Sequence, residues 1–454
     1  MKGDKIIIIG AGLSGTLLAI TMAQRGYQVA LYERRDDMRK VSMSAGRSIN
    51  LALSPRGMLG LDLAGIREEI LNECIPMQGR MIHPKGGQAF FQSYSGRKGE
   101  AINSVSRGGL NIALLNKAET FSNIEMYFNH TCTQVVLEKG VAYFKHEKTG
   151  IPVEAKGDII IGTDGSGSAV RKSMMEKTSE LLFNYSQHFL SHGYKELSIK
   201  PTADGGFQLD KNALHIWPRG SFMIIALPNM DGSFTVTMFH PFEGEYGFNH
   251  MKTPQQVQSF FETYYPELIP YMPDYVDEYF NNPTGSLGTV KCFPWQAYGK
   301  CLMMGDAAHA IVPFYGQGMN ASFEDVRVFN DIIDEHGDQW PQVFDMFQNQ
   351  RAENTNAIAD LAIDNFLEMR DRVDDADFML KRKIETELEF EIPDYYSKYS
   401  LVTFRADVPY ARAMHQGRAQ DELLLSWCQN GQLPSKEQMH AELLDLAKKF
   451  DHGH

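Results

Sequence analysis

A glycine-rich turn between an apolar run and a helical pattern is the feature that most restricts how this chain can fold. Residues 5–9 form a short continuous apolar run, which is typical of a strand buried on both faces. Gly10, Gly12 and Gly15 follow with the spacing GxGxxG, and a helical pattern then covers residues 13–25. A strand, a tight turn and a helix in this order predict the first unit of an open α/β sheet.

Each glycine of this turn has a physical role in binding the pyrophosphate of a dinucleotide. Gly10 permits the tight turn, Gly12 lets the backbone approach the phosphates, and Gly15 lets helix and strand pack closely. A second apolar run at 28–32 ends in Glu33, where an acid accepts hydrogen bonds from ribose hydroxyls. The agreement of strand, helix and acid predicts a dinucleotide site, and disfavours the alternative of a glycine-rich turn without a ligand.

Composition excludes several other classes of protein. The chain has 454 residues, 43% of them hydrophobic and 22% charged, which indicates a folded protein with room for two or three domains. A net charge of −13 and the lack of long Lys/Arg runs disfavour nucleic-acid binding. Five scattered cysteines without a CxxC spacing predict reduced thiols and no zinc site. No apolar run reaches the roughly 18 residues of a membrane span, so we expect a soluble, cytoplasmic protein.

Two later strand–turn segments bear on which dinucleotide binds, since the first motif fits both NAD and FAD. The apolar run 159–161 ends in a turn with Asp164, and the run 301–304 ends in Gly305 and Asp306. A carboxylate at this edge of an α/β sheet can hold polyol hydroxyls. A helix starting near Gly318 would point its positive end at a reduced flavin. These segments favour FAD.

Together the three segments resemble the fingerprints of the FAD-dependent aromatic hydroxylases, the p-hydroxybenzoate hydroxylase-like family. Arg107, at the start of a predicted helix over 107–118, matches the flavin-contacting arginine of that family. The resemblance implies bound FAD, with NADPH as a transient co-substrate and O2 as the oxidant. It implies that FAD is bound by Gly10, Gly12, Ser14, Gly15, Glu33, Arg34, Ala52, Arg107, Asp164, Asp306, Gly318, Met319 and Asn320.

Longer segments are similar to the members of this family that act on L-kynurenine; they are residues 46–53, 79–83, 192–197, 214–218, 314–320 and 399–404. The similarity implies hydroxylation of L-kynurenine to 3-hydroxy-L-kynurenine through a flavin C4a-hydroperoxide, in tryptophan catabolism or NAD biosynthesis. The chain ends without the hydrophobic extension of membrane-bound relatives, so we expect no membrane anchor. A hydroxylase for another anthranilate-like or phenolic acid and a non-catalytic flavoprotein remain alternatives, whereas the Trp-x-Trp-x-Ile-Pro signature of flavin halogenases is absent.

The same resemblance implies a set of substrate contacts. Arg80 matches the carboxylate-binding arginine, since its guanidinium can hold a carboxylate through two hydrogen bonds. The alternative is an arginine on an edge strand in a surface ion pair. The other matches are the polar residues Tyr94, Asn365 and Tyr399 and the ring-lining residues Ile225, Leu227, Phe239 and Phe314, for most of which core packing is the alternative.

No catalytic acid or base is expected, because the amino group of the substrate itself activates the ring. Tyr315 is a poor candidate for acid–base chemistry, and we interpret His309 as a structural residue. We also expect no metal site. The sequence leaves the oligomeric state open.

The order of patterns predicts an α/β fold in which a Rossmann-type FAD-binding domain is interleaved with a β-sheet substrate domain and followed by helices. Hairpin strands are expected at 77–83 and 88–94, further strands within 124–161 and 191–242, and helices at 319–335, 342–371, 374–389 and 436–450. The predicted boundaries are 1–75, 96–182 and 286–340 for the FAD-binding parts, 76–95 for the substrate hairpin, 183–285 for the β-rich substrate domain and 341–454 for the helical region.

Overall fold

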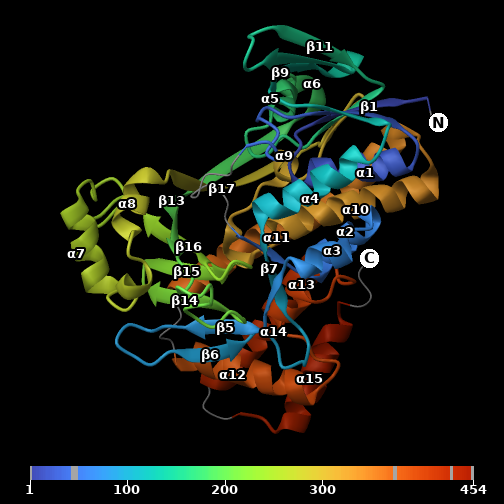
Figure 1. Ribbon diagram of the computed structural model, residues 1–454. Coiled ribbons are helices and arrows are strands. Elements are labelled where there is room, and N and C mark those ends of the chain that lie inside the picture. The colour runs from blue at the N-terminus through green and yellow to red at the C-terminus, as the bar shows by residue number, and fades with distance from the viewer. Residues whose placement is uncertain (1–2, 42–49, 372–375, 430–432, 451–454) are drawn as a thin grey trace.

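The computed structural model describes residues 3–41, 50–371, 376–429 and 433–450. Residues 46–49 of one family-like segment, and positions 374–375 of a predicted helix, lie outside these ranges. Figure 1 shows a sheet with covering helices in the upper part of the molecule, a second large sheet below it to the left, and further helices at the bottom. The predicted α/β class, with two interleaved sheet domains and a C-terminal helical region, is confirmed.

The six-stranded sheet has the order β18-β19-β12-β1-β2-β8. Strand β1 pairs in parallel with β2 on one side and with β12 on the other. Because β1 has covering layers on both faces, it needs the continuous apolar run that the sequence shows. The strands are β1 (Lys5–Ile9), β2 (Gln28–Tyr32), β8 (Ile124–Tyr127), β12 (Ile159–Gly162), β18 (Gln296–Ala297) and β19 (Cys301–Met303).

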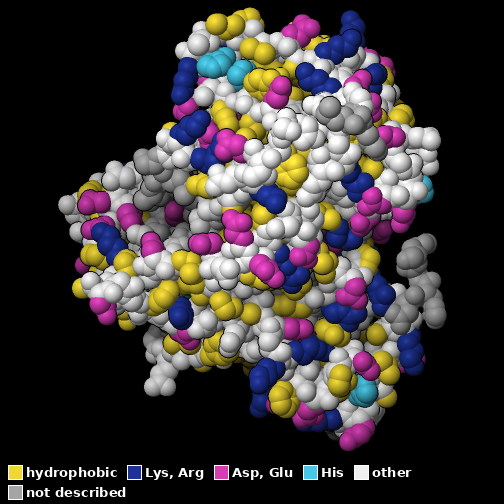
Figure 2. All heavy atoms as spheres, turned by 45° about the vertical axis from the view of Figure 1, so that its right-hand side comes forward, with side chains coloured by type: hydrophobic (Ala, Val, Ile, Leu, Met, Phe, Trp, Pro, Cys, Tyr) yellow, Lys and Arg dark blue, Asp and Glu magenta, His cyan; other side chains and the backbone are white. Residues whose placement is uncertain are grey.

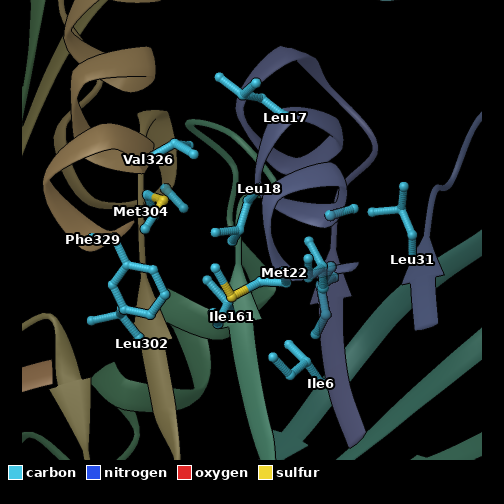
Figure 3. Close-up of a cluster of buried hydrophobic side chains, with 14 of the residues drawn as sticks. Ile6, Leu17, Leu18, Met22, Leu31, Ile161, Leu302, Met304, Val326 and Phe329 are labelled. Atoms are coloured by element: carbon cyan, nitrogen blue, oxygen red, sulfur yellow. The ribbon is translucent and has the colours of Figure 1, made fainter. Parts of the chain in front are cut away.

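The core of this domain lies between the sheet and its helices. Figure 3 shows Leu18 and Met22 from one helix meeting Ile161 of β12 and Phe329 of another helix, and these four side chains are buried. On the other face, Tyr32 of β2 stacks on Phe144 of a small sheet at 4.1 Å between ring centroids. The covering elements are α1 (Leu13–Gln24), α4 (Arg107–Glu119), α10 (Gly318–His336), β9 (His130–Val136), β10 (Val141–His146) and β11 (Pro152–Lys156).

Shorter elements complete this half of the molecule. A three-stranded sheet with the order β3-β7-β4 carries the chain between the two domains. These elements are β3 (Asn50–Leu53), β4 (Ile75–Met77), β7 (Ile102–Ser106), α2 (Pro55–Ala64), α3 (Arg67–Asn72), α5 (Ala169–Met175), α6 (Thr178–Leu181) and α9 (Asp306–His309). Single 3₁₀ turns lie at Leu137–Lys139, Ile269–Tyr271 and Pro313–Tyr315.

The second large sheet has seven strands in the order β17-β13-β16-β15-β14-β5-β6. The predicted hairpin forms its edge, because β5 pairs in parallel with β14 and antiparallel with β6. The strands are β5 (Gly79–Ile82), β6 (Phe90–Ser93), β13 (Asn184–Ile199), β14 (Ala213–Arg219), β15 (Phe222–Pro228), β16 (Phe234–Pro241) and β17 (Thr284–Phe293), with α7 (Pro254–Tyr264) and α8 (Tyr275–Asn281) beside them. The start of β13 before residue 191, and β17, were not expected.

The C-terminal helices are α11 (Trp340–Asp371), α12 (Ala376–Glu391), α13 (Lys398–Thr403), α14 (Tyr410–Gln429) and α15 (Lys436–Lys448). Of these helices, α12 and α15 lie below the hairpin strands β5 and β6 in Figure 1, and α11 and α13 lie above them. The 20-residue helix α14 was not predicted. Among the residues that the structure describes, no helix is both long and apolar enough to cross a membrane. Lys/Arg and Asp/Glu side chains are interspersed over the face in Figure 2, so that face carries no extended patch of one charge.

Candidate functional site

A cavity of about 580 Å³ contains side chains from both large sheets in its wall. Its lining extends along the chain from Ile9 at the end of β1 to Tyr399 in α13. Most of the predicted cofactor and substrate residues meet there. The lining includes Gly10, Gly12, Ser14, Glu33, Arg34, Ala52, Arg107, Asp164, Asp306, Gly318 and Met319 on one part, and Arg80, Tyr94, Ile225, Leu227, Phe239, Phe314 and Tyr399 on another.

The glycine turn presents bare backbone to this cavity. Gly10 has φ +108°, and a Cβ atom there would lie 2.4 Å from the Thr163 carbonyl oxygen. Gly15 lies behind the turn, where a Cβ atom would lie 1.9 Å from the Gly10 oxygen. A Cβ atom on Gly12 would meet nothing within 4 Å, because it would point into open space. Two glycines therefore allow close packing, and the third leaves room for a ligand.

Glu33 is held in place at the end of β2. Its Oε2 atom accepts a hydrogen bond from the Ala11 N–H at 3.0 Å, and its Oε1 atom accepts one from the Arg35 Nε atom at 2.8 Å. The side chain is buried against the protein and lines the cavity. The Oε1 atom also accepts from the Arg35 N–H at 3.0 Å, so the second lone pair of Oε2 is the one that can accept from a hydroxyl group of a ligand.

Asp164 and Asp306 follow β12 and β19 at the same edge of the sheet. Asp164 Oδ2 accepts from the Ala169 N–H at 2.6 Å, whereas its Oδ1 atom is buried without a partner. Burial raises the pKa of both carboxyl groups, and Arg107 partly offsets this effect on the pKa of Asp306. A buried carboxylate oxygen without a partner is costly, so it favours a ligand that donates a hydrogen bond.

The first turn of α10 forms another part of the wall. Gly318 and Met319 line the cavity, and the N-terminal N–H groups of a helix have no partner within the helix. Asn320 lies behind them and is fully buried. Its amide donates to the carbonyl oxygens of Ala52 at 2.8 Å and Gly316 at 2.9 Å, and its Oδ1 atom accepts from the Ser54 N–H. The Asn320 side chain thus fixes the wall and does not line the cavity.

Arg80 lies where the second sheet borders the cavity. Its strand β5 is flanked by β14 and β6, so the alternative of an edge-strand arginine is wrong. Its Nε atom is buried without a hydrogen-bond partner, and the side chain forms no ion pair with the described residues. The guanidinium carbon lies 4.7 Å from the ring centre of Tyr399 and 5.5 Å from that of Tyr94. These contacts leave the donors of Arg80 available to an anion.

Aromatic side chains surround Arg80. Tyr399 stacks between Tyr94 and Tyr315, with 5.4 Å between ring centroids in each pair. Burial raises the pKa of Tyr94 and Tyr315, so both phenols stay neutral near pH 7. This agrees with the interpretation that Tyr315 takes no part in acid–base chemistry. Phe239 and Phe314 pack together at 4.9 Å and form an apolar wall with Ile225 and Leu227.

Asn365 is the predicted substrate residue that does not line the larger cavity. It lines a separate cavity of about 80 Å³ that shares Arg80, Tyr315 and Tyr399 with the larger one. Its Nδ2 atom donates to the Phe314 carbonyl oxygen at 2.6 Å. Asn365 therefore supports the apolar wall and lies on the far side of Arg80.

His309 lies outside the cavity lining. Its Nε2 atom is 2.5 Å from Asp325 Oδ2, and its ring packs against Trp295 at 5.2 Å. These buried contacts fit the interpretation of His309 as a structural residue. Within the described part of the chain, no group of three His, Cys, Asp or Glu side chains is placed to hold a metal ion.

Sequence reasoning did not find several lining residues. His130, Thr131 and Cys132 come from the start of β9, and Met77 and Ile102 come from β4 and β7. None belongs to a short motif, because these residues reach the cavity through strand pairing between distant segments. The only available signal was that strands which follow a dinucleotide unit often return to its ligand edge.

Comparisons with known proteins agree with this geometry. The chain matches the family described as an FAD binding domain over residues 4–233 and 290–361. Kynurenine 3-monooxygenase of Myxococcus xanthus is 44% identical over 424 residues, which are 93% of this chain and 90% of that protein. The Dictyostelium discoideum enzyme of the same name is 42% identical over 97% of this chain and 95% of that protein.

Solved structures show the same fold. A tetrameric form of 2-methyl-3-hydroxypyridine-5-carboxylic acid oxygenase superposes with a TM-score of 0.67 at 17% identity, over 91% of this chain and 98% of that one. A p-nitrophenol 4-monooxygenase from Pseudomonas putida superposes with a TM-score of 0.65 at 15% identity, over 85% of this chain and 94% of that one.

Proposed function

This chain belongs to the kynurenine 3-monooxygenase family, and from that premise we propose which side chains hold the cofactor and the substrate. The protein is an FAD-dependent aromatic monooxygenase of the kynurenine pathway. It hydroxylates L-kynurenine to 3-hydroxy-L-kynurenine and uses NADPH and O2. Bound FAD supplies the redox chemistry, by accepting a hydride from NADPH and activating oxygen for transfer to the ring.

The residues around the glycine turn fit FAD. The open space at Gly12 accepts the pyrophosphate, whose charge the N–H groups of α1 stabilise. Glu33 accepts from ribose hydroxyls, and the unpartnered Oδ1 atom of Asp164 suits a hydroxyl donor. Asp306 and Arg107 face the same cavity, and the first turn of α10 stabilises negative charge on the flavin ring. Ser14, Arg34, Ala52 and Met319 complete the wall, while Gly15 and Asn320 support it from behind.

Arg80 carries the assignment of the substrate site. A half-buried guanidinium with no ion-pair partner in the described chain calls for an anion, and L-kynurenine brings a carboxylate. Tyr94 and Tyr399 lie within reach of the same head group, and Asn365 lies beyond it. Ile225, Leu227, Phe239 and Phe314 then enclose the ring end of the substrate.

The chain's own groups act by orientation and exclusion of water. Arg80 fixes the head of the substrate, so its ring has a defined position relative to the flavin. The Phe239–Phe314 wall keeps water from the place where oxygen is transferred. No side chain is assigned as an acid or a base, since the amino group of the substrate activates the ring carbon next to it.

The division of the chain into domains follows from the two sheets. Strands of the six-stranded sheet come from residues 5–32, 124–162 and 296–303, and those of the seven-stranded sheet from 79–93 and 184–293. These segments support FAD-binding parts at 1–75 and 96–182, with the substrate hairpin between them. Strand β17 of the substrate sheet extends to Phe293, so the third FAD-binding part, expected at 286–340, begins after this strand in our proposal. All five cysteines are free thiols, which supports the proposed cytoplasmic location.

The test uses purified, FAD-loaded protein with NADPH and oxygen, with and without L-kynurenine. NADPH loss is followed by absorbance, and the product is identified by chromatography and mass. We expect one 3-hydroxykynurenine for each NADPH. Stimulated NADPH loss that yields only hydrogen peroxide would mean that L-kynurenine binds but is not the true substrate, as for a hydroxylase of another anthranilate-like acid. No stimulation would refute the kynurenine assignment.

A further inference from the structure

A fully buried arginine joins the C-terminal helices to the wall of the cavity. Arg56 lies in the first turn of α2, and its side chain has no exposed surface. Its Nη1 atom is 2.8 Å from Glu324 Oε1 in α10. Glu324 in turn accepts from Arg351 of α11 at 2.6 Å. None of these three residues lines the cavity, so neither the cofactor nor the substrate explains them.

The Nε and Nη2 atoms of Arg56 both bind one piece of backbone. The Nε atom donates to the Val402 carbonyl oxygen at 3.1 Å, and the Nη2 atom donates to that of Arg405 at 2.9 Å and to that of Val408. These carbonyls lie at the end of α13 and in the loop before α14, which we call the connecting segment, residues 402–410. One side chain thus fixes the path of this segment against α10.

Each end of the connecting segment leads to a residue that lines the functional cavity, Tyr399 at one end and Gly318 at the other. Three residues before it, Tyr399 stacks beneath the guanidinium of Arg80. At its other end, the ring of Tyr410 lies 4.0 Å from the Arg56 guanidinium carbon. The Tyr410 hydroxyl donates to Gln317 Oε1 at 2.9 Å, and Gln317 directly precedes Gly318 at the start of α10. A continuous set of contacts therefore runs from Arg80 to the flavin-facing helix.

We propose that Arg56 is a positioning residue that couples the substrate end of the cavity to the first turn of α10. Through the connecting segment, binding at Arg80 and Tyr399 stabilises the α10 position that holds FAD. FAD and substrate then bind cooperatively through the protein, in addition to any direct contact between them. Because such coupling is reciprocal, each ligand tightens the other by the same factor. The substrate part of this inference rests on the proposed function, whereas the FAD part does not.

The experiment measures FAD release from the holoenzyme after dilution, by the gain in flavin fluorescence, with and without L-kynurenine. Tyr410→Phe removes only the hydroxyl that binds Gln317 and keeps the ring beneath Arg56. Tyr265→Phe is the matched control. The Tyr265 ring, directly after α7, is also buried, and its centre lies 4.9 Å from the guanidinium carbon of another arginine, Arg219. Arg56→Lys is the second variant, since lysine keeps the charge but cannot hold three carbonyls and a carboxylate in one plane.

We expect L-kynurenine to slow FAD release from the wild-type enzyme. The ratio of the release rate without L-kynurenine to the rate with it should fall at least threefold in both Tyr410→Phe and Arg56→Lys. Tyr265→Phe should leave the ratio of the two release rates unchanged. A merely structural role would speed release equally with and without L-kynurenine, and a ratio unchanged in Tyr410→Phe and Arg56→Lys would overturn the coupling.

Failure of the proposed substrate has a separate signature. If L-kynurenine leaves the flavin absorbance of the wild-type holoenzyme unchanged, it does not bind. The rates of FAD release measured without L-kynurenine then test the effect of the connecting segment on FAD binding. Release at least threefold faster in Tyr410→Phe than in Tyr265→Phe would then support the contact between the connecting segment and α10. Equal rates in these two variants would overturn it.

Discussion

Arg80 is the side chain whose surroundings say most about the ligand. A guanidinium in a partly desolvated place normally has a carboxylate partner, and here tyrosine rings take that place. Contacts with aromatic rings offset part of the cost of desolvation but supply no negative charge, and the Nε donor of Arg80 has no partner. These surroundings support the proposal that Arg80 binds an anion supplied by the substrate.

Arg80→Lys should raise the KM for L-kynurenine between about tenfold and about 100-fold, which corresponds to roughly 1.5–3 kcal/mol for a lost charge-assisted hydrogen bond. Lysine keeps the charge but cannot bind a carboxylate through two parallel N–H groups. Steady-state kinetics give the KM, and the flavin absorbance of the purified variant should show full FAD content. Arg67→Lys, in an exposed pair with Asp62, is the control and should leave the KM unchanged. An unaltered KM in Arg80→Lys would remove Arg80 from the substrate site.

Glu33→Ala should weaken FAD retention and leave the KM for L-kynurenine of FAD-loaded enzyme nearly unchanged. The change removes an acceptor for ribose hydroxyls and the partner of the Ala11 N–H in the phosphate turn. We expect affinity for FAD to fall by about tenfold or more, from roughly 1.5–3 kcal/mol of lost charge-assisted hydrogen bonding. Dialysis followed by measurement of the flavin-to-protein ratio tests this, and full occupancy after extensive dialysis would contradict it.

For single residues, the sequence predicts positions that a local motif sets, but not surroundings that depend on pairing between distant strands. Asp164 and Asp306 could be placed from the sequence because each ends a buried strand of the same sheet. The surroundings of Arg80 could not, since β5 meets β14 only through a parallel pairing with residues 213–216. A short strand with a charge in its middle does not reveal which strands flank it, so the alternative of an edge strand stayed open.

Among the elements, the unit formed by β1, α1 and β2 depends most closely on individual glycines. We expect Gly12→Ala to fold normally but lose FAD, because the added methyl group would enter only the ligand space. Gly15→Ala places a methyl group against the Gly10 carbonyl oxygen, so it should destabilise the fold by about 1–3 kcal/mol or more. Urea unfolding and flavin content separate the two effects, and equal loss of stability in both variants would contradict this assignment.

The elements that the sequence predicted well are those with strong local signals. A continuous apolar run and terminal glycines define β1 and α1, and the hairpin turn defines β5 and β6. The helix α14 lacked such a signal, because its buried face contains polar and charged residues as well as apolar ones. This face contacts α11 and α13. Strand β17 was missed since seven of its ten residues are partly or fully exposed, and its partner β13 is about a hundred residues away.

In the molecule as a whole, a buried group of charges ties distant segments together. Asp325 of α10 binds Arg351 of α11 at 2.7 Å and His309 of α9. Burial alone would raise the pKa of Asp325, but His309 and Arg351 outweigh it and lower that pKa. The same balance lowers the pKa of Glu324. Both carboxylates thus stabilise the folded state in their charged form.

Asp325→Asn should reduce the free energy of unfolding at pH 7 by about 3–5 kcal/mol, because Arg351 loses a buried partner. A lowered pKa contributes stability above the unfolded value of about 3.9 and loses it as the pH falls through the folded pKa. The difference in the free energy of unfolding between the wild type and Asp325→Asn should therefore become smaller below about pH 4. Urea unfolding at several pH values tests this, with the exposed Asp334→Asn as the control at roughly 0–1 kcal/mol. Equal losses in the two variants would contradict a special role for the buried network.

The walls of the cavity are far apart in the chain, and this affects how the protein is made. The glycine turn leaves the ribosome first, strand β19 follows only at residue 301, and Tyr399 comes near the end of the 454 residues. A growing chain exposes the apolar strands β1 and β12 before their neighbour β19 exists. We therefore expect flavin uptake to be a late event of biosynthesis, because a chain that terminates before residue 399 lacks part of the cavity wall.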